Sequence, residues 1–302
     1  MDNFSKIYSL CEEHGINAKY DVSMKNLTTF KIGGNAKLYA EAENSSHVSK
    51  LIKACRKYDV DYIVIGKGSN IVVNDDGLDK LVIRLTGDLA KVTRLDDTTI
   101  HCGAGLSLAG LCRDAENNSL SGLEFAWGIP GSVGGAVFMN AGAYGGEIKD
   151  VVYSVTHIDN DGKIGTIKGE DLDFGYRHSV YKHNGFTIIG ATFKLKLDNR
   201  TEIRNRMDDF MGRRKDKQPL EFPSAGSVFR RPEGAFAGAL IEQCGLKGKT
   251  VGGAQVSPKH AGFIVNIGGA TFEDVKNLVE LIQSTVKKET GYELKREIIF
   301  LN

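Results

Sequence analysis

The stretch that decides the fold is IPGSVGGA at 129–136, followed closely by NAGAYGG at 140–146. Six glycines fall within residues 131–146, interleaved with alanine and serine, so bulky side chains are excluded from a long run of backbone. Glycine in regular structure costs roughly 0.5–1 kcal/mol relative to alanine, so such a run gains little stability for the chain. We interpret it as a surface on which a flat cofactor lies against the backbone; a set of structural turns is the alternative.

A second glycine cluster, GKGSN at 66–70, follows the short apolar run 61–65. Two glycines separated by one residue let successive backbone N–H groups converge on one point, and such a nest binds an anion such as a pyrophosphate. Ser69 and Asn70 add side-chain donors. A glycine-rich turn before the next strand accounts for this pattern about as well, so both readings stay open.

The composition is that of a globular protein. Of 302 residues, 41% are hydrophobic and 25% are charged, which excludes a disordered chain. The formal charge of +1 offers no general attraction to nucleic acid, and no apolar run approaches the roughly 18 residues that span a bilayer. The N-terminus lacks the apolar centre of a signal peptide, and five cysteines without a CxxC pair favour a reducing compartment. We expect a cytoplasmic protein with no nucleic-acid partner and no membrane insertion.

Periodicity and turn residues predict a mixed α+β chain. Helices are expected at 3–14, from 45 onward, at 107–117, at 201–217 and from Thr271 to Gly291, and strands at 61–65, 80–85, 98–102, 186–189, 191–197 and 295–301. The longest helix has the clearest ends, because Thr271 is followed three residues later by Asp274 and Gly291 terminates the apolar stripe. The composition changes after Asp198, where we expect a separate C-terminal domain to begin.

Three further patterns predict no site. A dinucleotide fingerprint that starts at Gly103 requires a small residue at 108, where Leu108 stands, so a tight strand-to-helix turn is favoured. A phosphate-binding P-loop ending at 248–250 requires a glycine at the position of Gln243, so this segment is also interpreted as a turn. The seven histidines show no ligand spacing, and no metal site is expected.

The order of the motifs resembles one known family, the UDP-N-acetylenolpyruvoylglucosamine reductases, which are flavoenzymes that complete UDP-N-acetylmuramic acid for bacterial peptidoglycan. The resemblance covers nearly the whole chain, and the short span between Arg177 and Ser227 is similar to the subclass that lacks an extra substrate-capping loop. The motifs that carry the resemblance are LTTFKIGG at 27–34, GKGSN at 66–70, the stretch 129–145, GYRHS at 175–179, SAGSVF at 224–229, GGAQV at 252–256 and the terminal segment 293–300.

The resemblance implies a fold and a cofactor. The fold is α+β, a two-part FAD-binding module of the vanillyl-alcohol-oxidase (PCMH) type over 1–198, with subdomains of about 1–85 and 86–198, followed by a C-terminal α+β substrate domain over 199–302. FAD is expected to be non-covalent. The residues expected to bind it are Gly66, Lys67, Gly68, Ser69, Asn70, Ile129, Pro130, Gly131, Ser132, Val133, Gly134, Gly135, Asn140, Ala141 and Gly142.

The resemblance also implies a reaction and three catalytic residues. NADPH, the co-substrate, reduces FAD, and hydride then passes from N5 of the flavin to C3 of the enolpyruvyl group of UDP-N-acetylglucosamine enolpyruvate. Negative charge collects at C2 and on the substrate carboxylate, so the site needs a cation and a proton source. Arg177 is expected to stabilise the enolate, Ser227 to protonate C2, and Glu297, within the closing strand, to assist at the carboxylate. From the residues alone, each of the three is more readily a surface or turn residue.

Contacts to the UDP-sugar are assigned by the same logic to six residues. These residues are Tyr144, Lys217, Arg231, Lys247, Gln255 and His260. Arg231 departs from an asparagine that some relatives carry at its position. Two other hypotheses remain open: another FAD oxidoreductase of the same superfamily, with flavin attached through His or Cys, and a nucleotide-sugar binding module without chemistry.

Overall fold

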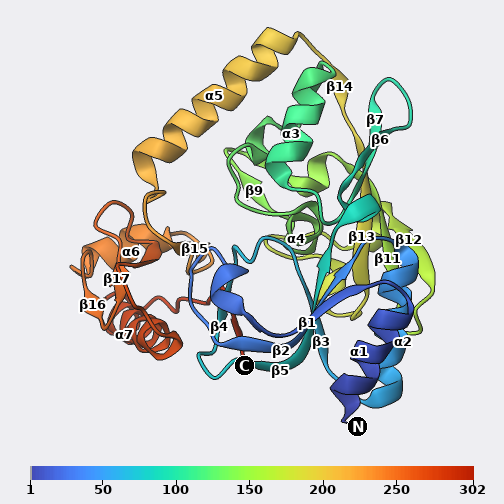
Figure 1. Cartoon of the computed structure of the whole chain (residues 1–302). Helices are drawn as coiled ribbons and strands as arrows, with labels where there is room; N and C mark the ends of the chain where they lie inside the picture. Colours follow the sequence, from blue (N-terminus) through green and yellow to red (C-terminus); the bar gives the residue numbers. More distant parts are fainter. Residues whose placement is uncertain (1) are drawn as a thin grey trace. The chain divides into compact units, whose positions relative to one another are not determined.

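Residues 2–302, described by a computed structural model, divide into two units that each have their own core (Figure 1). Unit 1 holds the described residues up to Asp21, then Lys37–Lys67 and Asp79–Gly212, and unit 2 holds Val22–Ala36, Gly68–Leu78 and Arg213–Asn302. The grouping follows the cores and not the chain order, because Phe30, Ile32 and Val72 are buried among apolar side chains of the C-terminal part. The expected domain limits, 1–198 and 199–302, stay a prediction.

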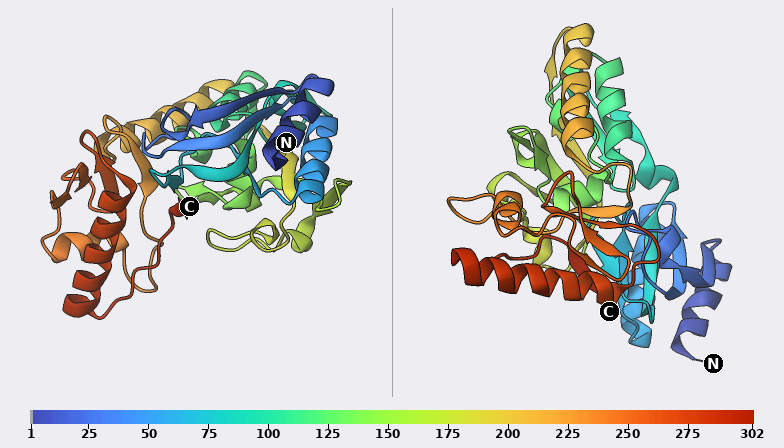
Figure 2. Two further views of the ribbon diagram at one scale, coloured as in Figure 1. Left: turned by 60° about the horizontal axis from the view of Figure 1, so that its bottom comes forward. Right: turned by 90° about the vertical axis from the view of Figure 1, so that its left-hand side faces the viewer.

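The first sheet of unit 1 is covered by the two N-terminal helices, which lie side by side in both views of Figure 2. Its strand order is β1 (Asn17–Ser23), β2 (Asn35–Ala42), β5 (Leu78–Leu85), β3 (Tyr62–Ile65). The helices are α1 (Asn3–Glu13) and α2 (Ser45–Tyr58). β3 runs parallel to β5, with Tyr62 opposite Leu81, so the loop that leaves β3 begins at Gly66.

The second sheet of unit 1 is antiparallel, in the order β12 (Ile164–Lys168), β11 (Val152–Ile158), β13 (Thr187–Lys194), β7 (Thr99–Gly103), β6 (Val92–Arg94). The remaining elements of this unit are α3 (Leu108–Asn117), α4 (Val133–Phe138), which packs on β13, and two short ribbons, β8 (Leu120–Ser121) with β14 (Lys196–Leu197) and β9 (Gly142–Ala143) with β10 (Gly146–Glu147). The two strands predicted at 186–189 and 191–197 are wrong as separate strands. Instead, one strand, β13, runs through Gly190. A Cβ at Gly190 would lie 2.8 Å from Nε2 of His101 on the neighbouring strand, so only glycine leaves room for that imidazole.

Unit 2 is built on a four-stranded antiparallel sheet, in the order β15 (Ser224–Ser227), β18 (Phe263–Asn266), β17 (Ala254–Val256), β16 (Thr250–Val251). Its helices are α6 (Ala237–Gln243) and α7 (Phe272–Thr290), and a separate parallel pair joins β4 (Ile71–Val73) to β19 (Ile299–Leu301). The predicted ends of α7 are confirmed, since Thr271 and Asp274 form a capping box and Gly291 ends the helix with a left-handed backbone.

The closing strand is shorter than the predicted 295–301. β19 begins only at Ile299, because the preceding residues hydrogen-bond to a different partner. The backbone N–H of Arg230 donates to Lys295, and that of Glu297 donates to Val228. Glu297 therefore precedes the strand, beside the continuation of β15, and the prediction that it lies within the strand is wrong.

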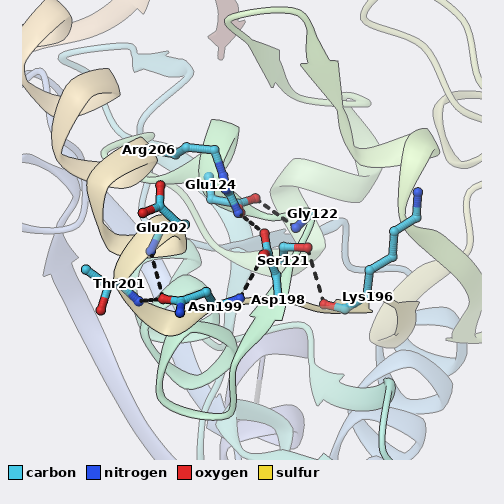
Figure 3. Close-up of polar contacts among 9 residues, drawn as sticks. All are labelled: Ser121, Gly122, Glu124, Lys196, Asp198, Asn199, Thr201, Glu202 and Arg206. Atoms are coloured by element: carbon cyan, nitrogen blue, oxygen red, sulfur yellow. Dashed lines mark hydrogen bonds and ion pairs between the residues drawn. The ribbon is translucent and has the colours of Figure 1, made fainter.

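Helix α5 (Arg200–Lys217) confirms the predicted charged helix, and it lies beside α3 in Figures 1 and 2. Ile203 and Met207 of this helix are buried in the core of unit 1, and ion pairs add further contacts. Figure 3 shows Arg206 reaching Glu124, whose carboxylate oxygen accepts hydrogen bonds of 3.1 and 2.7 Å from Nε and Nη2. The other Glu124 oxygen accepts the backbone N–H of Gly122 at 2.7 Å, and Asp198 also pairs with Arg206.

This contact predicts an asymmetry between two ion pairs on α5. Arg206→Ala leaves Glu124, which is 8% exposed, without its charged partner, so the free energy of unfolding should fall by about 1–3 kcal/mol. The control is Asp208→Asn, which breaks the exposed pair with Arg204 and should change that free energy by less than about 0.5 kcal/mol. Urea unfolding measures both, and equal losses in the two variants would contradict the prediction.

Candidate functional site

The loop at 66–70 presents a row of backbone donors. Within residues 2–302, the backbone N–H groups of Lys67, Gly68, Ser69 and Asn70 form no hydrogen bond. Gly68 has a left-handed backbone, with φ +61°, which turns successive N–H groups toward one side. Four such donors match an anion with several oxygens, as a diphosphate has.

The same loop is packed too closely for side chains at its glycines. A Cβ at Gly68 would lie 2.3 Å from the carbonyl oxygen of Leu27 and 2.8 Å from Cα of Thr28. A Cβ at Gly66 would lie 2.0 Å from Oγ of Ser132, which places the start of the loop against the second glycine stretch. The two predicted cofactor segments are therefore in contact inside unit 1, at Gly66 and Ser132.

The stretch 129–135 lies on the turn between β7 and α3. The backbone N–H of Val133 donates to Leu106 and that of Gly134 donates to Ala104, each at 2.8 Å. A Cβ at Gly134 would lie 2.9 Å from Cβ of Ala104, so this glycine is required by packing. The segment that begins at Gly103 is thus a tight strand-to-helix turn, as predicted, and it supports residues 129–135.

Arg177 occupies a tight turn of unit 1 in a strained conformation. Gly175 and His178 exchange two backbone hydrogen bonds of 3.2 and 3.1 Å around it. The backbone of Arg177 is left-handed, with φ +54°, a region that non-glycine residues rarely adopt. Its Nη2 donates to the carbonyl oxygen of Gly142 at 3.4 Å, and the guanidinium lies 5.1 Å from the centre of the Tyr176 ring.

The segment beside this turn is the second half of the glycine motif. Asn140 is fully buried, and its side-chain amide donates to the carbonyl oxygen of Gly175 at 2.9 Å. Tyr144 and Gly145 both have left-handed backbones, as the two central residues of a tight hairpin between β9 and β10 require. The Tyr144 ring stacks on Phe210 of α5 at 4.8 Å.

Ser227 and Glu297 lie together in unit 2. Ser227 is the last residue of β15 and is exposed, after an irregularity at Gly226, whose φ is +77°. Glu297 is half-buried, and its backbone N–H donates to Val228 at 2.8 Å, so the two candidates stand on hydrogen-bonded segments.

Residues 68–70 adjoin this pair. A Cβ at Gly226 would lie 3.9 Å from the carbonyl oxygen of Ser69, and Nδ2 of Asn70 donates to the carbonyl oxygen of Glu297 at 3.2 Å. Ser227, Glu297 and residues 68–70 are thus brought together in one unit. Arg177 belongs to the other, and its meeting with these residues stays a prediction.

Two of the predicted substrate contacts lie near the end of α5 and just after β15. Lys217 ends α5 and is exposed. Arg231 is exposed, and its guanidinium lies 3.9 Å from the centre of the Phe236 ring. Both are cations at the surface of unit 2.

The other three candidates of unit 2 have internal partners. Lys247 pairs with Glu242 at 2.7 Å. The amide of Gln255 donates to the carbonyl oxygen of Gly248 and to Thr250, across the β16–β17 hairpin. His260 accepts the backbone N–H of Gly262 on Nδ1 at 3.1 Å, and burial lowers its pKa, so the imidazole is neutral at pH 7. Their role as substrate contacts remains untested.

Two polar residues near Ser227 received no role from the sequence. Thr29 donates its hydroxyl to the carbonyl oxygen of Ser224 at 2.7 Å and its N–H to Gly68, so it joins β15 to the loop at residues 66–70. Arg230 has its Nε buried with no hydrogen-bond partner among residues 2–302. Both lie in quoted motifs or next to them, which was the only signal for them in the sequence.

Metal-ligand groups, membrane spans, cysteines and the main cavity add no candidate site among the described residues. Residues 2–302 contain no group of three or more His, Cys, Asp or Glu placed to hold a metal, and none of their helices is long and apolar enough to cross a membrane. Burial raises the pKa of the thiols of Cys11, Cys55 and Cys112, to about 11, 12 and 12. A cavity of about 550 Å³ in unit 2, which includes Lys25, Lys31 and Asn266–Thr271, contains none of the predicted site residues.

Comparison with known proteins gives two family matches. Residues 36–168 match the family described as FAD binding domain, and residues 218–301 match the family described as UDP-N-acetylenolpyruvoylglucosamine reductase, C-terminal domain. A protein of Clostridium novyi named UDP-N-acetylenolpyruvoylglucosamine reductase is 45% identical over 99% of this chain and 96% of its own. A protein of Syntrophomonas wolfei with the same name is 44% identical over 98% of each chain.

Solved structures agree with these matches. The crystal structure of the UDP-N-acetylenolpyruvylglucosamine reductase of Thermus caldophilus is 36% identical and superposes on 95% of this chain and 99% of its own, with a TM-score of 0.81. A variant of berberine bridge enzyme shares the fold alone, at 19% identity and a TM-score of 0.50 over 64% of this chain and 44% of its own. The predicted fold, an FAD-binding module with a C-terminal α+β domain, is confirmed. With such identity over almost its whole length, the chain belongs to the UDP-N-acetylenolpyruvoylglucosamine reductase family and is an FAD-containing oxidoreductase.

Proposed function

We propose that this chain uses NADPH to reduce the enolpyruvyl group of UDP-N-acetylglucosamine enolpyruvate to UDP-N-acetylmuramate, in the cytoplasm, as a step of peptidoglycan synthesis. The observation that carries the proposal is the grouping of Ser227 and Glu297 beside the loop 68–70 in unit 2. The 45% identity to a relative with the corresponding name supports the choice of substrate.

The glycine loops fit a non-covalent FAD. The four N–H groups of Lys67–Asn70 would hold its diphosphate, and residues 129–135 with Ala141 and Gly142 would face other parts of it. Bound FAD supplies a hydride carrier between NADPH and the enolpyruvyl C3. Neither 66–70 nor 129–146 contains the His or Cys that covalent attachment uses, which favours reversible binding.

Three side chains divide the remaining chemistry. When C3 gains hydride, negative charge collects at C2 and on the substrate carboxylate. The planar guanidinium fork of Arg177 suits a carboxylate. The Ser227 hydroxyl, exposed at the end of β15, donates the proton to C2, and Glu297 on the adjacent segment assists at the carboxylate.

The UDP-sugar diphosphate needs positive partners outside this trio. Lys217 and Arg231 supply two exposed cations for it, and Lys247 supplies a third if it exchanges its partner Glu242 for the substrate. Tyr144, Gln255 and His260 contribute contacts to the uncharged parts. Lys247, whose ammonium already pairs with Glu242, is expected to contribute less than Lys217.

The decisive experiment separates two half-reactions. Purified protein should absorb near 450 nm, an approximate property of oxidised flavin, lose that absorbance on anaerobic mixing with NADPH, and regain it when UDP-N-acetylglucosamine enolpyruvate is added. Flavin that NADPH reduces but this substrate does not reoxidise would sink the proposal. Flavin that remains with the protein after acid precipitation would indicate covalent attachment, and a colourless protein would favour a module without chemistry.

Replacement of Ser227 by alanine tests the proton donor. Ser227→Ala should leave reduction of the flavin by NADPH nearly unchanged and slow reoxidation by the enolpyruvyl substrate by about 10²–10⁴-fold. Ser284→Ala, which removes an exposed hydroxyl on α7, should leave both rates unchanged. Stopped-flow absorbance of the two half-reactions is the measurement, and equal loss in both would show that Ser227 has another role.

A pair of glycine variants tests the diphosphate loop. Gly68→Ala and Gly245→Ala both place alanine in a left-handed backbone, at φ +61° and +68°, which costs about 1–2 kcal/mol. Only at Gly68 does the new methyl group also collide with backbone, since nothing lies within 4 Å of a Cβ at Gly245. The Kd for FAD, from flavin fluorescence titration of apoprotein, should rise by about tenfold or more, or 1.4 kcal/mol, in Gly68→Ala alone. The same Kd in both variants would exclude this loop as a cofactor contact.

A further inference from the structure

Asn140 uses all its amide hydrogens inside unit 1. Its Nδ2 donates to the carbonyl oxygen of Gly175 at 2.9 Å and to Oε2 of Glu147 at 3.2 Å, and its Oδ1 accepts the backbone N–H of Lys149 at 3.0 Å. An asparagine side chain carries two amide hydrogens, so both are engaged. The residue is also fully buried. It therefore presents no donor to a bound molecule.

The partner of this amide is the first residue of the turn that carries Arg177. The carbonyl oxygen of Gly175 accepts two hydrogen bonds, one from Asn140 and one from the backbone N–H of His178. Arg177 stands between them in a left-handed conformation that an arginine does not favour by itself. Such a conformation persists only where the surroundings over-determine it.

The segment 140–142 holds this turn at two points. Asn140 fixes the backbone of the turn through Gly175, and the carbonyl oxygen of Gly142 accepts the guanidinium Nη2 of Arg177 at 3.4 Å. Gly142 is itself paired with Glu147 in the β9–β10 ribbon, and Glu147 is the second acceptor of the Asn140 amide. The backbone and the side chain of Arg177 are thus positioned from one short segment.

We propose that Asn140 is a positioning residue for Arg177, and that it acts through the carbonyl oxygen of Gly175 and not by contact with the cofactor. The inference rests on the proposed function of Arg177 at the substrate carboxylate. It differs from the direct cofactor contact predicted for Asn140 from the sequence, because both side-chain amide hydrogens already have partners. Loss of the amide donor should displace the guanidinium and leave the flavin site intact.

Three variants separate these roles. Asn140→Asp keeps a residue that tolerates φ +42° and keeps the acceptor for Lys149, but it removes the donor to Gly175 and places a carboxylate against Glu147. Asn140→Gly keeps the backbone freedom and removes the whole side chain. The matched control is Asn118→Asp, since the Asn118 amide also donates to a main-chain oxygen and a carboxylate, both of Asp114, at the end of α3.

The expected result is a loss confined to one half-reaction. Asn140→Asp should slow reoxidation of the flavin by the enolpyruvyl substrate on the order of 100-fold, because a misplaced catalytic group costs about that much. In the same variant, the rate of flavin reduction by NADPH and the Kd for FAD should stay within about twofold of the parent values. In Asn118→Asp, both half-reaction rates and the Kd for FAD should stay within the same range. In an Arg177→Gln background, Asn140→Asp should cause no further loss, since interacting residues are not additive.

Other outcomes overturn the proposal. A higher Kd for FAD with both half-reactions slowed would mean that Asn140 serves the cofactor. Unchanged reoxidation, or losses that multiply with those of Arg177→Gln, would mean that it acts independently of Arg177. If Asn140→Asp does not fold, Asn140→Gly is read in the same way, and failure of both to bind flavin would assign Asn140 to the stability of unit 1.

Hydrogen exchange keeps this test independent of the proposed activity. The backbone N–H of His178 donates to the carbonyl oxygen of Gly175. It should exchange faster in Asn140→Asp than in the parent protein, and its exchange rate should be unchanged in Asn118→Asp. If the parent protein reduces no enolpyruvyl substrate, the proposed function fails, while exchange at His178 still reports whether Asn140 holds the turn. Unchanged exchange in Asn140→Asp contradicts the proposed linkage whatever the activity.

Discussion

The close approach of the Gly68 backbone to Leu27 and Thr28 is the constraint on which much of unit 2 depends. Gly68 accepts the N–H of Thr29, and Asn70 donates its side chain to Glu297 while its carbonyl oxygen accepts the N–H of Ile299. One loop thereby fixes the entry of β4, the start of β19 and the segment beside Ser227. A Cβ at position 68 would force these contacts apart, so the geometry of this part of the candidate site requires glycine at 68.

The two units are not consecutive pieces of chain. The division passes through the loop 66–70, so its first two residues belong to unit 1 and its last three to unit 2. Apolar burial explains why the early segments 22–36 and 68–78 group with the C-terminal part, because Phe30, Ile32 and Val72 have their partners there.

The structural features that the sequence predicted correctly are those that depend on residues close together in the chain. Both ends of α7 were predicted because Thr271, Asp274 and Gly291 act within a turn of the helix. The closing strand was drawn too long because its length depends on Val228, about seventy residues earlier, which takes the N–H of Glu297 away from any strand partner. The two glycine segments could be located in the sequence. The contact that requires glycine at 134, with Cβ of Ala104, could not be predicted.

The left-handed backbone of Arg177 and its support by Asn140 were beyond a sequence argument. An arginine gives no local sign of such a conformation, and the two residues are separated by 37 positions. Asn140 was predicted from the glycine motif to bind the cofactor, and that prediction stays a prediction. The burial of Asn140 and its hydrogen bond to Gly175, on which the proposed positioning role rests, depend on the fold and not on the motif.

The surroundings of Asn140 also bear on the durability of the protein. An asparagine loses its amide spontaneously when the following backbone nitrogen attacks the side-chain carbonyl, a common form of ageing in proteins that contain exposed asparagines. Here that nitrogen belongs to Ala141, and its N–H is held by the carbonyl oxygen of Ala136 at 2.8 Å. The attack would require this bond to break inside a closely packed interior. The hydrogen bonds that hold Asn140 and Ala141 therefore also hinder conversion of the amide to a carboxylate.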